Sequence, residues 1–147
     1  MLNIITKTFP DLSTQELYSI LQLRSAVFVV EQNCVYQDMD GKDQKAMHVL
    51  GFKNDNLVAY TRIFKAGDYF EQASIGRVVV AKAERQHKYG YEIMNASIDV
   101  ITKELKETTI KISAQAYLKI FYNNLGFKEI GEGYLEDDIP HIAMLWP

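Results

Sequence analysis

The feature that most constrains this chain is the segment from residue 74 to residue 115, where two strand patterns flank a helix pattern. The strand expected from Ser74 to Val80 ends in three consecutive valines, which is typical of a strand buried on both faces. A turn leads into a helix expected from Gly90 to Lys106, and alternating residues predict a second strand at 109–115. Two strands joined by a helix in this way pair in parallel through a right-handed crossover.

A first helix is expected from Ser13 to Val30, because Ser13 and Glu16 have the spacing of a capping box and apolar residues follow at helical intervals. Arg24 lies beside the apolar stripe of this helix and therefore needs a buried partner or access to solvent. The other expected elements are strands at 2–6, 48–53 and 57–64, a loop at 31–47, a short helix within 117–127, and two strands between 128 and 146. This order predicts one α/β domain over residues 1–147, with a mixed β-sheet flanked by helices.

The balance of charges and apolar residues excludes several classes of protein. With 16 basic and 19 acidic residues the formal net charge is −3, so general nucleic-acid binding is not expected. No apolar run approaches the roughly 20 residues of a membrane helix, and the N-terminus has no signal-peptide pattern. The single cysteine, Cys34, cannot form an internal disulfide, which fits a reducing compartment. We therefore expect a cytoplasmic monomer or homodimer that binds neither nucleic acid nor a membrane.

The turn from Arg85 to Gly90 has two interpretations. Its position before a helix offers unpaired N–H groups and the positive end of a helix dipole, while Arg85 and Lys88 add positive charge. Gly90 permits either a close approach of the backbone or a positive φ. These features suit a pyrophosphate, but basic residues are also common in an ordinary solvated connector between a strand and a helix. The residues of the turn leave both interpretations open.

Two segments resemble the GNAT superfamily of N-acetyltransferases. The turn RQHKYG matches that superfamily's acetyl-CoA motif at Arg85 and Gly90 and departs from it at Lys88, where the motif has glycine. In YLKIFYNNLGF, Tyr122 stands four residues before the Gly-Phe pair, as in the superfamily's second signature. The segments LQLRSAVFVVEQNCVYQDMDGKD, SAQAYLKIFYNNLGF and IPHIAM are similar to the ElaA branch, so the resemblance covers nearly the whole chain.

This resemblance implies the GNAT fold, a splayed mixed sheet that takes acetyl-CoA as a cosubstrate where the fourth and fifth strands part. It also implies that Tyr122 is the general acid that protonates the departing thiolate. The positions implied to contact acetyl-CoA are the strand residues Val78, Val79 and Val80, for the pantetheine arm, and Arg85, Gln86, His87, Lys88, Tyr89, Gly90 and Tyr91, for the pyrophosphate. A lysine at position 88 makes a positive φ unfavourable there, where glycine would adopt it freely.

The general base is expected among groups that titrate near neutral pH or are buried carboxylates. Glu31 and His141 are the leading candidates for the base or for the wall of the acceptor pocket, and Asp38, Asp40 and His48 are further candidates. Taken singly, each also fits a loop charge or a hydrogen-bonded strand histidine. The acidic turn at 136–138 has the charge to attract a cationic amine, although turns are acidic for solubility just as often.

No metal site is expected. The run DMDGKD at 38–43 contains three aspartates, but a calcium loop with its glycine at Gly41 would place Tyr36 and Met47 where carboxylate ligands belong. The histidines and Cys34 are too dispersed for a zinc site. The expected activity is direct transfer of an acetyl group to a primary amine of a small molecule or peptide. The alternatives are an acyl-CoA-binding regulatory or interaction domain without catalysis, and a phosphate-binding α/β domain unrelated to coenzyme A.

Overall fold

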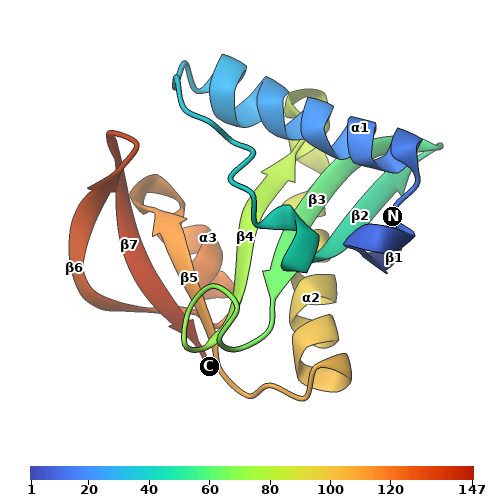
Figure 1. Ribbon diagram of the computed structural model, residues 1–147. Coiled ribbons are helices and arrows are strands. Elements are labelled where there is room, and N and C mark those ends of the chain that lie inside the picture. The colour runs from blue at the N-terminus through green and yellow to red at the C-terminus, as the bar shows by residue number, and fades with distance from the viewer.

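The computed structural model describes residues 1–147 and contains one seven-stranded mixed sheet (Figure 1). Its strands are β1 (Asn3–Thr8), β2 (Met47–Lys53), β3 (Asn56–Phe64), β4 (Ala73–Val80), β5 (Ile110–Gln115), β6 (Lys128–Glu136) and β7 (Ile139–Trp146). The α-helices are α1 (Thr14–Arg24), α2 (Tyr89–Asp99) and α3 (Lys119–Asn124). The spatial order of the strands is β1-β2-β3-β4-β5-β7-β6. The predicted order of elements and the predicted α/β fold class with a mixed sheet are confirmed.

Helix α1 begins as its sequence predicts. The Ser13 side chain accepts a hydrogen bond from the Glu16 backbone N–H at 3.0 Å, and the Glu16 carboxylate accepts one from the Ser13 N–H at 2.8 Å. The helix continues past Arg24 as a π-helical segment, Ser25–Glu31. The predicted helix is therefore continuous, but its C-terminal part is wound as a π-helix instead of an α-helix. Helix α2 continues in the same way, as the π-helical segment Val100–Glu104.

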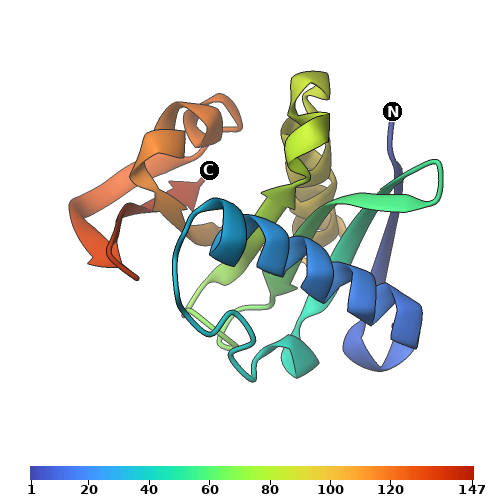
Figure 2. The ribbon, with the colours of Figure 1, turned by 90° about the horizontal axis from the view of Figure 1, so that it is seen from above.

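The helices cover opposite faces of the sheet. Val49 and Leu50 are neighbours on β2, and their side chains therefore point to opposite faces. Val49 packs in the core cluster that contains residues of α2, whereas Leu50 packs against Ile20 and Leu23 of α1. Figure 2 shows α1 on one side of the sheet and α2 and α3 on the other. None of the helices combines the length and the apolar character needed to cross a membrane.

The sheet divides where β4 and β5 diverge. These parallel strands pair only at Ala73↔Ile110 and Ser74↔Lys111, near their beginnings. Beyond this point Arg77 takes a left-handed conformation, with φ 48°, and the register between β3 and β4 shifts. The end of β4 pairs with β3 alone, so the opposite edge of Val78–Val80 is left without a strand partner. Figure 1 shows the two strands separating toward the end of α1.

The chain closes with short turns that suit their residues. Gly126 follows α3 with φ 103°, in the position where a glycine terminates a helix, as its sequence predicts. Strands β6 and β7 form a hairpin whose two turn residues, Asp137 and Asp138, both have positive φ, which is the turn favoured between antiparallel strands. Glu136 is therefore the last residue of β6, directly opposite Ile139.

Candidate active site

A cavity of about 510 Å³ opens where β4 and β5 diverge, and it brings together most of the residues predicted for the site. The predicted residues that line it are Glu31, Val78, Val79, Val80, Arg85, Lys88, Gly90, Tyr91, Tyr122 and His141. Three predicted cofactor residues, Gln86, His87 and Tyr89, are not in its wall. Tyr89 is buried in the core instead, and the ring of His87 packs against it at 5.2 Å between centroids.

One wall of the cavity is the unpaired edge of β4. Backbone N–H and C=O groups at a strand edge are ready to pair with another extended chain of amides. Because Val78–Val80 lie on this edge and all three line the cavity, a ligand with amide groups can extend the sheet here. The recognition would depend on the backbone, so it places little demand on the identity of these side chains.

The turn after β4 presents its own backbone to the same cavity. A 3₁₀ segment, Lys82–His87, leads to Lys88, which has φ 60° and ψ 28° in the left-handed region. Helix α2 follows, and no side chain caps its N-terminus. Gly90 does not have a positive φ. It permits close packing instead, because a Cβ there would lie only 3.2 Å from the ring of Phe121. The conformation that a glycine would adopt freely is thus taken by Lys88.

The charged groups beside this turn are partly neutralised. The guanidinium of Arg85 donates to both carboxylate oxygens of Glu31, at 2.5 and 2.8 Å. This hydrogen bond from Arg85 holds the pKa of Glu31 below its usual value. A carboxylate that is held ionised in this way is a weak proton acceptor, so Glu31 suits an anchor of the turn better than a general base. Lys88 makes no ion pair and is the unpaired cation of the turn that lines the cavity.

Tyr122 reaches the cavity from α3. Its ring is buried between Phe121 and Phe127, in edge-to-face contacts with centroid separations of 5.0 and 5.9 Å. Burial, with a smaller effect of Tyr117, raises the pKa of Tyr122 above its usual value. The phenol therefore stays protonated at neutral pH. No protein group hydrogen-bonds its hydroxyl, which leaves the O–H free to donate to a ligand in the cavity.

His141, on β7, presents one ring nitrogen to the cavity. Its Nδ1 lies 2.7 Å from the backbone oxygen of Ile139, and a carbonyl can only accept, so Nδ1 carries the proton. In the neutral ring Nε2 is then the acceptor, and it lies 3.5 Å from Oε2 of Glu136. Ser113 of β5 donates to the other oxygen of Glu136 at 3.1 Å and also contacts the hydroxyl of Tyr134. Ser113 was not among the residues considered from the sequence, and Glu136 was considered only as part of the acidic turn at 136–138.

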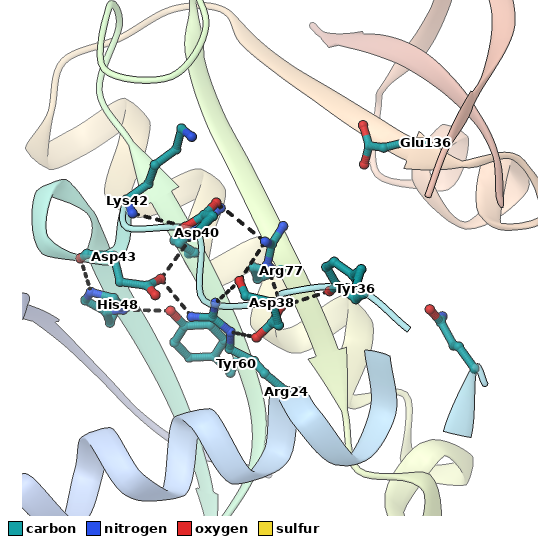
Figure 3. A network of polar contacts seen from close by, with 12 residues as sticks. Arg24, Tyr36, Asp38, Asp40, Lys42, Asp43, His48, Tyr60, Arg77 and Glu136 are labelled. Atoms are coloured by element: carbon teal, nitrogen blue, oxygen red, sulfur yellow. Dashed lines mark hydrogen bonds and ion pairs between the residues drawn. The ribbon is translucent and has the colours of Figure 1, made fainter. Parts of the chain in front are cut away.

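A buried ion network holds the loop that forms another wall of the cavity (Figure 3). Three arginines from three elements meet three aspartates of the loop before β2: Arg24, Arg62 and Arg77 with Asp38, Asp40 and Asp43. The contacts are short, for example 2.7 Å between Arg24 and Asp43 and 2.9 Å between Arg62 and Asp40. Equal numbers of opposite charges make the network neutral. It also supplies the partner that the buried Arg24 requires.

This network contains the three further candidates for the general base, Asp38, Asp40 and His48. The carboxylates of Asp38 and Asp40 are engaged by arginines and do not line the cavity. His48 accepts a hydrogen bond from the Tyr60 hydroxyl at 2.6 Å and donates one to the Asp43 carbonyl at 3.0 Å. Burial lowers the pKa of His48, so it stays neutral inside the network. The three residues therefore support the loop, and their geometry does not direct them toward a substrate.

The same loop is tied to the half of the sheet beyond the divide. The side-chain amides of Gln32 and Gln115 exchange hydrogen bonds of 3.2 Å, and the Cys34 thiol lies 3.5 Å from the backbone oxygen of Asp137. Tyr36 donates to Asp38 at 2.8 Å and lines the cavity. The cavity is thus enclosed by β4 on one side, the β6–β7 hairpin on the other, and this loop between them.

Comparisons with known proteins agree with this geometry. A family model described as an acetyltransferase (GNAT) domain matches residues 8–146. Protein ElaA of Escherichia coli strain K12 is 48% identical over 136 residues, which cover 91% of this chain and 89% of that protein. The crystal structure of Escherichia coli ElaA matches with a TM-score of 0.92 and 44% identity over the full length of both chains. A crystal structure of an acyl-CoA N-acyltransferase from Pseudomonas aeruginosa matches over both full lengths with a TM-score of 0.94 and 39% identity.

Proposed function

This chain belongs to the acetyltransferase (GNAT) family, as its resemblance to the ElaA branch predicts, and we propose that it transfers an acetyl group from acetyl-CoA directly to a primary amine. Family and fold support an acyltransferase that uses an acyl-CoA. The acetyl donor, the amine acceptor and the direct transfer are the proposal. One observation carries it: the free edge of β4, the turn around Lys88 and the hydroxyl of Tyr122 all face one cavity.

The residues present fit acetyl-CoA. The edge of Val78–Val80 that has no strand partner offers backbone groups for the amides of pantetheine, and the Val80 carbonyl on it already accepts from Nε of Arg85 at 3.2 Å. The uncapped N-terminus of α2 and the cation of Lys88 suit the pyrophosphate. When bound there, acetyl-CoA supplies an acetyl group already activated as a thioester. No residue of the chain then needs to form a covalent intermediate.

The roles of the chain's residues follow from the chemistry of the transfer. The amine must lose a proton before its nitrogen can attack, and Nε2 of His141, beside the cavity-lining Glu136, is the nitrogen that can take this proton in the neutral ring. As the carbon–nitrogen bond forms and the carbon–sulfur bond breaks, negative charge develops on sulfur, and the Tyr122 hydroxyl is placed to donate to it. The nitrogen loses its second proton as the amide forms, and this proton restores the Tyr122 hydroxyl. The products are an N-acetyl amide, coenzyme A as its free thiol and one proton released through His141.

The test is a thiol-release assay with acetyl-CoA and a panel of primary amines, run beside calorimetric titration with acetyl-CoA alone. Calorimetric binding together with amine-dependent thiol release supports the proposal. Acetyl-CoA binding without thiol release from any amine would favour the alternative, a binding or regulatory domain that lacks catalysis. Absence of acetyl-CoA binding would overturn both and revive a phosphate-binding domain unrelated to coenzyme A.

Lys88→Gly is expected to weaken acetyl-CoA binding about three- to tenfold without a loss of stability. The substitution removes the unpaired cation of the turn that lines the cavity, and the affinity difference should shrink at high salt. It also relieves a left-handed lysine, which costs about 1–2 kcal/mol, and this gain offsets the added flexibility of glycine. Titration calorimetry at two salt concentrations measures the affinity change.

Lys106→Gly is the matched control, because Lys106 is an exposed lysine with φ 59° that lies outside the cavity. The two variants should change the free energy of unfolding similarly, and only Lys88→Gly should change acetyl-CoA affinity. Tighter binding by Lys88→Gly would mean that the lysine side chain obstructs the phosphate site.

A further inference from the structure

The charges that line the cavity are arranged so that its two ends differ in sign. Arg85 is paired with Glu31, and the two arginines from the loop network are each paired with aspartates. The lining charges left without an ionic partner of opposite sign are Lys88 at the turn before α2 and the carboxylates of Glu136 and Asp137 at the β6–β7 turn. The basic end suits the phosphates of acetyl-CoA, so the acidic end faces the other substrate.

Glu136 is fixed in place and directed into the cavity. Ser113 holds its Oε1, which leaves Oε2 free, and Figure 3 shows the carboxylate turned from the hairpin toward the side of Arg77 and Tyr36. The side chain of Glu136 is 47% exposed, so its charge is partly screened but can be reached from the cavity. A carboxylate oxygen without a donor, held at this position, is a receptor for a cation.

His141 shares this receptor. It is 6% exposed, and with Nδ1–H bound to the Ile139 carbonyl, its Nε2 is an acceptor. Nε2 lies 3.5 Å from Oε2 of Glu136, and in the neutral ring both of these atoms are acceptors. The ring is kept in this orientation by stacking against Tyr134, at 6.2 Å between centroids. A group with several N–H donors and a positive charge would satisfy both acceptors at once.

We propose that the acceptor is a primary amine that is protonated at neutral pH and carries no carboxylate beside it, and that its ammonium is received between Glu136 and His141. This inference rests on the proposed acetyl transfer and names the substrate class of the same site. An ammonium has three donors, enough for Oε2, for Nε2 and for one further group. Transfer of one proton from the ammonium to Nε2 leaves a neutral amine with a lone pair and a positively charged imidazole beside the carboxylate of Glu136. The proton count is unchanged by this step.

The same charges disfavour other acceptors. An arylamine is neutral at pH 7.5 and gains nothing from the charge of Glu136. An α-amino acid brings a carboxylate next to its ammonium, and the two cavity-lining arginines from the loop network, Arg62 and Arg77, already bind aspartates. Its carboxylate would instead lie near Glu136 and Asp137, where like charges repel.

The experiment compares three ligands of similar shape: benzylamine, which is cationic; aniline, which is neutral; and phenylalanine, which is zwitterionic. Each is titrated by calorimetry into the protein saturated with coenzyme A, and each is also tested for thiol release with acetyl-CoA. Glu136→Gln keeps the size of the side chain and removes its charge. Glu132→Gln is the matched control, since Glu132 is exposed on the same strand and lies outside the cavity.

Benzylamine is expected to bind more tightly than aniline and phenylalanine, and Glu136→Gln is expected to weaken its binding and its kcat/KM about tenfold or more. Acetyl-CoA affinity should be unchanged, and Glu132→Gln should match the unaltered protein. Benzylamine binding that depends on Glu136 but gives no thiol release would keep this inference and refute acetyl transfer. Thiol release that Glu136→Gln leaves unchanged, a preference for aniline or phenylalanine, or no amine binding at all would overturn the inference.

Discussion

Replacing Tyr122 with phenylalanine is expected to lower kcat about 100-fold while the Kd for acetyl-CoA stays within about twofold. The hydroxyl is the only group removed, and it has no hydrogen-bond partner in the protein. The ring contacts with Phe121 and Phe127 are retained, so the position of α3 should not change. The lower kcat would therefore show that the Tyr122 hydroxyl donates a hydrogen bond or proton to sulfur as the thiolate departs. This interaction develops only in the transition state.

Steady-state kinetics with an acetylated amine and calorimetry with acetyl-CoA measure the two quantities. Tyr18→Phe is the control, since Tyr18 is an exposed tyrosine on α1 outside the cavity and should lose nothing. A purely structural role for the Tyr122 hydroxyl predicts a change in unfolding and none in kcat. If kcat of Tyr122→Phe stayed within about twofold of the unaltered protein, Tyr122 would have no part in the proton transfer.

The elements of this fold are predictable because their signals are local. The capping box at Ser13 and the glycine after α3 each lie within a few residues of the helix end they mark, and both are confirmed. The valine strand and the helix after it predict a parallel pair, which the structure confirms over two residue pairs only. The divergence of β4 and β5 has no such local signal, because it depends on the left-handed Arg77 and on what holds it.

The parts of the site that the sequence did not predict depend on contacts between distant residues. Arg77 is 39 residues from Asp38, and Ser113 is 23 residues from Glu136. The need of Arg24 for a partner is visible in the helix pattern, but the identity of that partner is not. One signal was available: charged residues inside the apolar strand patterns, at positions 62 and 77, are unusual unless they are paired.

The loop network links stability to the shape of the cavity. It joins α1, β3 and β4 to the loop that carries Tyr36 into the cavity wall, and its members are largely buried. A buried ion pair contributes little net stability against an apolar replacement, but removal of one partner leaves an uncompensated charge. Each of the three aspartates contacts two arginines. At Asp43 a single oxygen, Oδ1, accepts from both Arg24 at 2.7 Å and Arg62 at 3.0 Å, so the network is expected to be most sensitive there.

Asp43→Asn is expected to lower the free energy of unfolding by about 3 kcal/mol, because the isosteric amide keeps the packing and leaves one positive charge in excess. Urea unfolding at neutral pH measures the loss. Asp99→Asn is the control: Asp99 is 62% exposed and 3.6 Å from Lys103, so its loss should cost less than about 0.5 kcal/mol. An effect of Asp43→Asn below about 1 kcal/mol would mean that the two arginines are satisfied without it.

The pH dependence of the free energy of unfolding distinguishes a loss of charge at Asp43 from a packing defect. Burial alone would raise the pKa of Asp43, but the hydrogen bond and charge of Arg24 and Arg62 hold it below its usual value. The pKa is therefore lower in the folded chain than the value of about 3.9 in the unfolded chain. The stabilisation is then complete above about pH 5 and is lost progressively as the pH falls through the unfolded and then the folded pKa. The stability difference between the unaltered protein and Asp43→Asn should narrow over that range, whereas a packing defect would keep it constant.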